Sequence, residues 1–274
     1  MAARTIQPAH PGPGFSTGHA AGHRIHKVAG FVQVDGTWLD LGCGPGEYGS
    51  ELLRHGCRCV VGCDPRFEEA WVTSPLGHEY VQSVSEALPF VDQSFDGVLI
   101  NEVLEHVADD HMTLSEVHRI LKPSGVLVLF GPNRWFPLEG HGATLGPFNV
   151  EVPVPVLPWL PRGLASRWMR ARNYWPGELS ALVKGAGLVI EQVGFAYPLF
   201  NEYEWLPRPA ANKARALAPR FETIPVVRRF GVSTMIIARR PDPASLHRSA
   251  GRRSDTRHLL SQRPRRRRRP AHQQ

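Results

Sequence analysis

The sequence lacks a long uninterrupted apolar run. Although 42% of its 274 residues are hydrophobic, no window approaches the roughly 18 to 20 continuous apolar residues that a helix needs to span a bilayer. We therefore expect a soluble protein with a cytoplasmic location and, at most, a peripheral membrane contact. Residues 1–22 are rich in Gly, Pro, His and Ala and lack the apolar stretch of a signal peptide, so we expect a flexible leader there.

Cysteine is scarce too, which excludes a small fold stapled by disulfides. The four cysteines fall within 21 residues: Cys43, Cys57, Cys59 and Cys63. Without a secretory signal we expect reduced thiols. Their C-x-C-x3-C spacing lacks the C-x2-C pair of a typical zinc site. We therefore interpret them as small buried hydrophobic residues rather than metal ligands.

Most of the chain lacks an excess of basic residues. The formal net charge is +7 and the pI is about 9.6, which taken alone suggests a nucleic-acid or anionic-membrane partner. Residues 241–274, however, hold ten arginines and two acids, a net charge of +8, which leaves −1 for residues 1–240. This segment has few apolar side chains, so we expect a disordered Arg-rich tail. A nucleic-acid contact or a localisation signal in the tail stays open.

Between residues 37 and 131, short apolar runs alternate with amphipathic stretches. This pattern is typical of βαβ units and predicts an α/β fold with a parallel sheet. We expect strands at residues 38–41, 58–63, 79–81, 95–100, 126–130, 188–195 and 233–238. We expect helices at residues 47–54, 66–71, 102–121 and 176–184.

Two segments interrupt this pattern. Residues 132–176 contain many Pro, Trp and Phe residues and no clean period, so we expect an insertion over the edge of the sheet where ligands bind. A Pro-rich apolar stretch within it runs into four arginines, for which we favour a lid helix over a membrane contact. Residues 197–229 form a second irregular insertion on the same side. The whole domain is expected to span residues 23–240.

The most informative motif is the run D-L-G-C-G-P-G from Asp40 to Gly46, between an expected strand and an expected helix. Glycine tolerates positive φ and lets a ligand approach the backbone, so Gly42, Gly44 and Gly46 can wrap a cofactor. Asp64 ends the next strand, 18 residues after Gly46, where an acid accepts hydrogen bonds from ribose hydroxyls. The spacing departs from the G-x-G-x-x-G of dinucleotide sites. Because Asp40 suits a cationic amino group better than a phosphate, the loop favours S-adenosylmethionine.

With these residues the sequence resembles the class I S-adenosylmethionine-dependent methyltransferases, particularly their type-11 group. Three blocks, spread over residues 36–132, carry the resemblance: Asp40 to Gly46; Glu86-Ala87-Leu88-Pro89-Phe90 with Ser94-Phe95-Asp96; and Val103-Leu104-Glu105-His106 leading to Leu121-Lys122-Pro123-Ser124-Gly125. The resemblance implies a Rossmann-like sheet of seven strands in the order 3-2-1-4-5-7-6, with the last strand antiparallel. It also implies S-adenosylmethionine as the cofactor.

The resemblance further implies roles for single residues. Asp40 would face the methionine end of the cofactor, and Asp64 would hold its ribose. The loop that contains Glu86 and Ala87 would contact the adenine. Asn101, at the end of the fourth strand, would contact the cofactor mainly through its backbone.

Candidate catalytic residues follow the fourth and fifth strands. A base is needed only if the methyl acceptor must lose a proton; His106 is one candidate, and Glu139 and His141 are candidates to line the acceptor pocket. Glu102, Glu105 and His106 form E-x-x-E-H, expected on one helix face. This element is similar to the metal-binding element of ubiquinone-pathway O-methyltransferases and of small-RNA 2′-O-methyltransferases. Acids in a first helical turn also simply complement the helix dipole, so we assign no metal ligand.

The leading hypothesis is therefore methyl transfer to an O or N atom of a small-molecule, glycan or lipid-type acceptor. RNA 2′-O-methylation is one alternative, but the near-neutral charge of residues 1–240 argues against nucleic acid as the main partner. The other alternative is an inactive module that binds the cofactor and serves as a scaffold.

Overall fold

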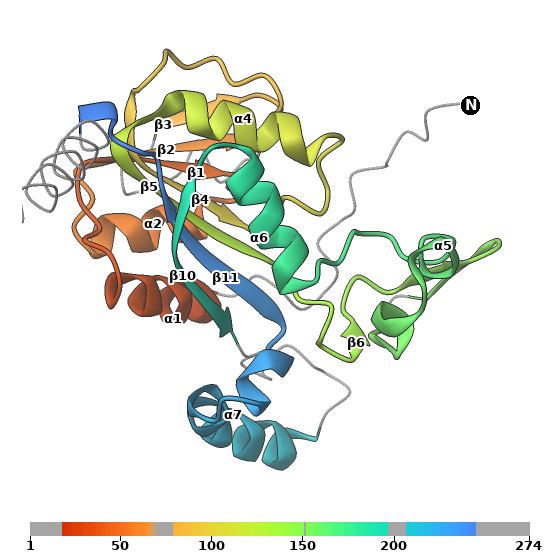
Figure 1. Cartoon of the computed structure of the whole chain (residues 1–274). Coiled ribbons are helices and arrows are strands. Elements are labelled where there is room, and N and C mark those ends of the chain that lie inside the picture. Colours follow the sequence, from red (N-terminus) through yellow and green to blue (C-terminus); the bar gives the residue numbers. More distant parts are fainter. Residues whose placement is uncertain (1–17, 67, 69–78, 151, 197–206, 245–274) are drawn as a thin grey trace, which may run out of the picture. The chain divides into compact units, whose positions relative to one another are not determined.

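Seven strands of the computed structural model form one sheet (Figure 1). The structure describes residues 18–66, 68, 79–150, 152–196 and 207–244. The strands of the sheet are β1 (Thr37–Leu41), β2 (Cys59–Asp64), β3 (Glu79–Gln82), β4 (Phe95–Asn101), β5 (Leu121–Pro132), β10 (Val189–Ala196) and β11 (Ser233–Arg239). All seven lie where the apolar runs predict strands, within a few residues at their ends.

The strand order is β10-β11-β5-β4-β1-β2-β3. Numbered along the chain and taken from the other edge, it is the predicted order 3-2-1-4-5-7-6. β1 pairs in parallel with β2 and β4, and β4 pairs in parallel with β5. β11 is antiparallel to both of its neighbours. The predicted Rossmann-like topology is confirmed, and the carboxyl ends of the parallel strands meet at one edge, the usual ligand edge of an open α/β sheet.

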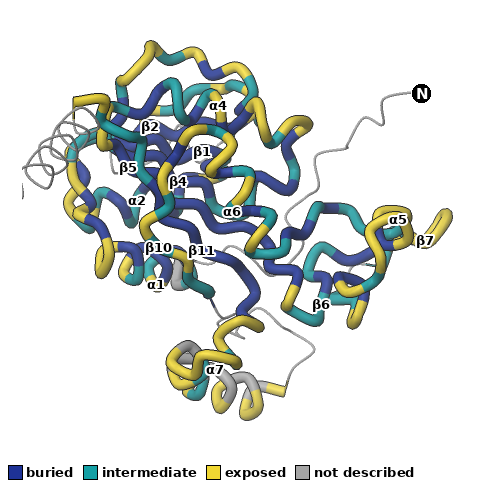
Figure 2. Tube along the Cα trace, viewed as in Figure 1, coloured by how far each residue is buried: buried dark blue, intermediate teal, exposed yellow. Residues whose placement is uncertain are grey.

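Helices cover both faces of this sheet (Figure 1). α1 (Gly18–Ala29) and α2 (Glu47–Arg54) pack on one face, whereas α4 (Asp110–Ile120) and α6 (Pro176–Gly185) pack on the other. Each face has its own apolar core, one centred on the side chains of Trp38 and Phe130 and the other on those of Leu114 and Leu179. The two cores sandwich the buried sheet (Figure 2), so the loops at its carboxyl edge have a rigid support.

Two of the expected boundaries are wrong. The leader was expected to reach residue 22, but α1 already begins at Gly18, because Ala21 and Ile25 are buried against the sheet. The helix expected at 102–121 is only α4, since the Asp109 carboxylate accepts the Met112 N–H at 2.9 Å and caps the helix there. Residues 102–109 form turns instead. Glu102 among them has a left-handed φ of 53°.

The second insertion also contains regular structure that the sequence reading missed. The segment expected to be irregular includes α7 (Arg208–Thr223) and the short 3-10 helix η2 (Val227–Phe230). Alanine is the strongest helix former and recurs along α7, while Pro209 lies in the first turn, where proline is tolerated. Residues 197–206 and most of the expected helix at 66–71 lie outside the described residues.

The first insertion, here defined as residues 133–175, connects β5 to α6. Its elements are β6 (Leu138–Glu139), β7 (Ala143–Leu145), β8 (Phe148–Val150), β9 (Val154–Pro155), η1 (Leu157–Trp159) and α5 (Arg162–Ala165). β6 pairs with β9 and β7 with β8, both antiparallel. The expected lid helix is therefore short, four residues in α5, and small β-ribbons make up much of the insertion.

The pattern of contacts between residues divides the chain into two units, residues 1–240 and residues 241–274. Of the second unit only residues 241–244 are described, so the expected Arg-rich tail lies almost wholly outside the described residues. Among the helices that the structure describes, none is long and apolar enough to cross a membrane. The cytoplasmic location stays a prediction.

The cysteines agree with the sequence interpretation. All four are free thiols, three of them buried and Cys59 half-buried. Burial raises the pKa of the Cys57 and Cys63 thiols to about 12, so both are protonated and behave as small apolar groups.

Candidate functional site

The glycine loop connects β1 to α2 and has the predicted backbone. Gly42, Gly44 and Gly46 have φ angles of 74°, 47° and 90°, which are unfavourable for residues with a side chain. A Cβ on Gly42 would lie 2.2 Å from a methyl group of Val103, so the loop packs closely against the β4–α4 connection. Among the described residues, a Cβ on Gly44 would meet nothing within 4 Å. The described part of the chain therefore leaves space beside Gly44.

Asp40 lies at the penultimate position of β1 and is 2% exposed. Its Oδ2 accepts the Gly49 N–H at 2.9 Å, which ties the strand to the first turn of α2. Burial raises the pKa of this carboxyl to about 7; the Gly49 hydrogen bond opposes the rise and the nearby Asp64 adds to it. A bound cationic group would restore the charge of the carboxylate, as expected for the methionine ammonium.

Asp64 is buried at the end of β2, beside the glycine loop. It accepts the Gly44 N–H at 3.1 Å and the Arg66 N–H at 3.0 Å. These bonds fix the carboxylate next to the open part of the loop. This is the place where a ribose would meet it.

The side chains of the cofactor candidates Glu86 and Asn101 bind other parts of the protein. Oε1 of Glu86 accepts the N–H groups of Ala108 and Asp109, so its side chain anchors the loop before α4. Ala87 is the next residue in the chain, and its N–H donates a hydrogen bond to the Val84 carbonyl. The Asn101 side chain accepts a hydrogen bond from Arg24. Both side chains are thus engaged within the protein, and the backbone contact of Asn101 with the cofactor stays a prediction.

The three candidate catalytic residues come together at this edge. His106 lies in the turns between β4 and α4, and Glu139 and His141 lie in the insertion. Oε1 of Glu139 is 2.9 Å from Nδ1 of His141 and also accepts the His141 backbone N–H at 3.1 Å. The imidazole rings of His106 and His141 meet edge to face, with centroids 5.0 Å apart. Two segments distant in sequence thus build one cluster.

Glu105 completes this cluster and carries its most unusual electrostatics. Its Oε1 lies 3.8 Å from Nε2 of His106 and 3.9 Å from Nε2 of His141. Within the described part of the chain, neither of its buried carboxylate oxygens has a hydrogen-bond partner, a costly arrangement for an ionised acid. Burial, and then the neighbouring Glu102, raise the pKa of Glu105 well above its usual range. Burial, with His141 second, lowers the pKa of His106 to about 4.

Glu102 is not part of the cluster, although E-x-x-E-H predicts a shared helix face. Its left-handed backbone directs the carboxylate to Arg24 Nη1, 2.9 Å away, and to the Ser233 hydroxyl. Arg24 also donates to Ser233 Oγ at 2.8 Å and lies over the Phe130 ring. The expectation of one helical face is therefore wrong, because the helix begins eight residues later, at Asp110.

Several supporting residues escaped the sequence reading. Asn173 donates to Oε2 of Glu139 at 2.6 Å and holds this carboxylate from the side opposite His141. Arg172 donates to the carbonyls of Leu104 and Val107, and the Tyr174 hydroxyl donates to the Leu104 carbonyl. These bonds attach the end of the insertion to the turn that carries Glu105 and His106. Arg24, also missed, is 77 residues from its partner Asn101, so no local pattern reveals it.

The cluster fits a divalent cation only in part. One oxygen of Glu105 and one nitrogen each of His106 and His141 lie within 4.8 Å of one another, and a carboxylate with two imidazoles is a suitable ligand set. The two unpartnered oxygens of Glu105 support this fit. The E-x-x-E-H motif would also supply the Glu102 carboxylate as a metal ligand, but this carboxylate forms an ion pair with Arg24 instead.

Known proteins match both the sequence and this arrangement. Residues 39–129 match the methyltransferase domain family. A ubiquinone biosynthesis O-methyltransferase from Azorhizobium caulinodans is 32% identical over 196 residues, which cover 68% of this chain and 72% of the relative. The chain belongs to the S-adenosylmethionine-dependent methyltransferases. The cofactor of this family is S-adenosylmethionine, and the predicted class I, type-11-like assignment is confirmed.

A second relative has a higher sequence identity to this chain, but the match covers a smaller share of both proteins. The ubiquinone biosynthesis O-methyltransferase from Ruegeria pomeroyi is 36% identical over 174 residues, which cover 61% of this chain. The chain spans 64% of that methyltransferase and 65% of the Brucella anthropi relative of the same name. It therefore covers slightly less than two thirds of these relatives.

Solved structures support the methyltransferase fold. An S-adenosylmethionine-dependent methyltransferase from Mesorhizobium loti has a TM-score of 0.57 at 20% identity, with 82% of this chain and all of that chain covered. A 1,6-didemethyltoxoflavin-N1-methyltransferase from Burkholderia thailandensis, solved with S-adenosylhomocysteine, has a TM-score of 0.50 at 19% identity, with 83% and 80% covered. At these identities the likeness concerns the fold of the methyltransferase.

Proposed function

We propose that this methyltransferase transfers a methyl group from S-adenosylmethionine to a hydroxyl oxygen of a small-molecule acceptor. The observation that carries the proposal is the Glu139–His141 pair, with its 2.9 Å contact, at the ligand edge of the sheet. Transfer to a hydroxyl needs a group that takes up the proton. The names of the relatives, ubiquinone biosynthesis O-methyltransferases, support oxygen as the acceptor atom.

The glycine loop and the two aspartates would bind the cofactor. Asp64 would accept hydrogen bonds from the ribose hydroxyls, and Asp40 would face the methionine ammonium. Gly44 provides the open backbone between them. When bound, the cofactor would supply a methyl group activated by its sulfonium, with the sulfur as the leaving group that retains the electron pair of the carbon–sulfur bond.

The Glu139–His141 pair would receive the acceptor's proton. If Nδ1–H of His141 donates to the buried Glu139 carboxylate, Nε2 is left as the acceptor nitrogen of the neutral imidazole. Nε2 faces the side of the cluster occupied by Glu105. Asn173 and the His141 backbone N–H hold Glu139 in place, so the ring is oriented before an acceptor binds. His106, whose pKa is lowered to about 4, is a weak base at neutral pH.

A divalent cation would be held by Glu105, His106 and His141, within the limits of the partial fit described above, and would then occupy Nε2 of His141 in place of the acceptor's proton. Such an ion supplies Lewis acidity, which lowers the pKa of a hydroxyl bound to it. The side chains would keep their present placement: Glu139 would orient the His141 ring, and Arg24 would retain Glu102.

The test measures S-adenosylhomocysteine release with catechol, phenol, an aliphatic alcohol and a primary amine as acceptors. We expect release with a hydroxyl compound. His141→Asn should reduce turnover by roughly 10² to 10⁴-fold, the usual contribution of a general base, while cofactor affinity is retained. Glu139→Gln should reduce turnover less, because the imidazole remains.

A matched control is His111→Asn, since His111 is exposed on α4, away from the cluster. It should leave turnover unchanged. Release with the amine alone, or full turnover by His141→Asn, would contradict the proposed assignment.

A further inference from the structure

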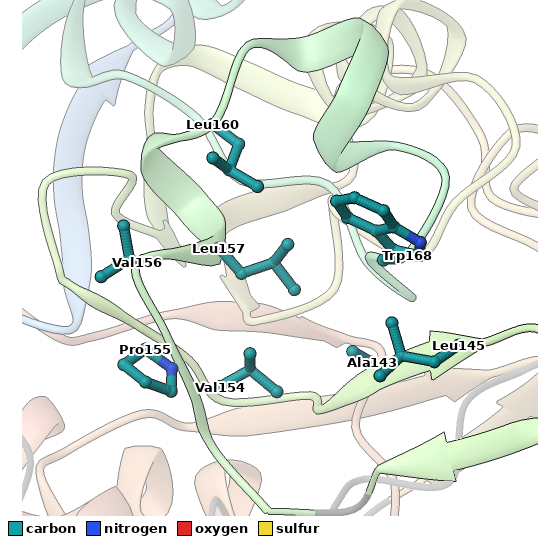
Figure 3. Close-up of a pocket in the computed structure, with 8 residues that line it drawn as sticks. All are labelled: Ala143, Leu145, Val154, Pro155, Val156, Leu157, Leu160 and Trp168. Carbon is teal, nitrogen blue, oxygen red and sulfur yellow. The ribbon is translucent and has the colours of Figure 1, made fainter.

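The insertion contains an apolar pocket that the proposed chemistry does not use (Figure 3). Its volume is about 240 Å³, and none of the described residues that line it is charged. The lining residues are Ala143, Leu145, Val154, Pro155, Val156, Leu157, Leu160 and Trp168. In Figure 3, Leu157 lies at the centre of this group, between Leu160 and Trp168 on one side and Val154 on the other.

The pocket is built on the same ribbons as the catalytic candidates. In the β6–β9 pair, Val154 lies directly opposite Glu139. Ala143 follows His141 by two residues and bridges to Met169, next to Trp168. Directly opposite residues of an antiparallel pair have Cβ atoms about 5 Å apart. An acceptor with its hydroxyl at His141 therefore has the pocket within reach of its other end.

The rim of the pocket is strained and apolar. Val156 has a left-handed φ of 66°, an unfavourable conformation for a β-branched residue. Strain of this kind is found at ligand clamps and is retained because the surroundings enforce it. Val156 is 51% exposed and Leu145 is 46% exposed, so apolar side chains remain in water at the entrance.

We propose that this pocket binds a hydrocarbon substituent of the methyl acceptor. The identity of the ligand as the acceptor rests on the proposed function; the apolar site itself does not. A lining without charges disfavours a glycan or a nucleotide, which need polar partners. A volume of about 240 Å³ is below the roughly 300–1,000 Å³ of a pocket for a whole drug-sized ligand. It exceeds the roughly 150 Å³ apolar cavity that takes up benzene, so it suits one substituent.

The experiment measures binding of 4-methyl-, 4-butyl- and 4-octylcatechol by calorimetry, with S-adenosylhomocysteine present to prevent turnover. Each methylene that enters the pocket should raise the affinity by about threefold to fourfold. We expect 4-butylcatechol to bind at least about tenfold more tightly than 4-methylcatechol, with a smaller gain per carbon once the pocket is full.

Two matched variants test whether the gain in affinity with alkyl chain length arises in this pocket. Leu160→Trp fills the pocket, whereas Leu164→Trp makes the same change four residues later, at an exposed position that is not part of the lining. Leu160→Trp should remove the gain with chain length, and Leu164→Trp should keep it. Leu145→Glu, at a half-exposed lining position, puts a charge at the entrance and should weaken 4-octylcatechol at least about tenfold without opening the core.

The outcomes separate the two proposals. Equal affinities of the three catechols for the unmodified protein, or equal losses in both Trp variants, would overturn the hydrocarbon site, even if methyl transfer is observed. A chain-length effect that Leu160→Trp abolishes would support the site even if no catechol is methylated. Failure of every hydroxyl compound to be methylated would instead contradict the proposed function.

Discussion

Asp40 lies on a central strand with its carboxyl almost completely buried, and burial raises its pKa to about 7. The usual value is 3.8, so the native state holds this proton more tightly than the unfolded chain does. The resulting contribution to folding stability is therefore lost as the pH rises towards 7. The same shift makes the charge at the methionine end of the cofactor site depend on pH.

We expect S-adenosylhomocysteine to bind more tightly as the pH rises from 5 to 7. The ammonium of the ligand is fully charged there, whereas Asp40 gains its charge as the pH approaches its pKa. Below that pKa the affinity should rise by up to about tenfold per pH unit. Calorimetry across this range measures it, and Asp40→Asn is the control that should bind weakly and without this slope. A flat profile for the unmodified protein would show that Asp40 does not face the ammonium.

Arg24 joins three elements through one guanidinium: α1, the end of β4 and the start of β11. Arg24→Met should destabilise the fold by about 3 kcal/mol, because removing one partner leaves Glu102 as an uncompensated, mostly buried charge. Glu102→Gln should cost less, since the amide oxygen still accepts from Arg24. Chemical denaturation measures both. Equal stability of Arg24→Met and the unmodified protein would mean that the ion pair with Glu102 has no role in folding.

Among the elements, the turns from residue 102 to residue 109 matter most, because they carry Glu105 and His106. Four groups outside the turns fix them: Glu86 holds the N–H groups of Ala108 and Asp109, and Arg172, Tyr174 and Arg24 bind other parts of the segment. A helix through these residues would satisfy its own backbone and would need none of these bonds. The non-helical segment explains why Glu102 and Glu105 have separate partners.

The cap of α4 is a direct test of this boundary. Asp109→Ala removes the acceptor for the Met112 N–H and should reduce the free energy of unfolding by about 1 kcal/mol. Ser115→Ala, at an exposed position inside the same helix, is the control and should be neutral or slightly stabilising. Urea denaturation measures the difference. A loss in Ser115→Ala as large as that in Asp109→Ala would argue against a cap at this residue.

For the molecule as a whole, the sequence predicts the sheet and the glycine loop better than the side-chain contacts within the site. The apolar runs predict the βαβ units and the parallel sheet, and the resemblance carried by the glycine loop and its neighbouring blocks implies the strand order. The cluster of Glu105, His106 and His141 depends on how the insertion folds back on the β4–α4 turns, and that contact is set by side chains such as Asn173 and Arg172. Pairings between residues so distant in sequence leave no periodic signal. The apolar pocket is hidden for the same reason.

The charge distribution makes a prediction at this scale. A chain that ends at Arg240 loses the segment of charge +8 and retains −1, and all of the candidate site residues remain. We expect it to bind S-adenosylhomocysteine with unchanged affinity and to elute from heparin at much lower salt than the full chain does. A loss of cofactor affinity in the shortened chain would mean that residues 241–274 belong to the site.

Methyl transfer to oxygen can be followed directly with S-adenosylmethionine that carries a ¹³C-labelled methyl group. The label is observed by NMR during incubation with the protein and an alkylcatechol, and Asp64→Ala, which removes the proposed ribose acceptor, is the control. We predict that the sulfonium methyl signal declines as a methoxy signal grows, and that both changes are much slower for Asp64→Ala. A label that stays on sulfur, or that appears on nitrogen when an amine replaces the catechol but never on oxygen, would contradict the proposal.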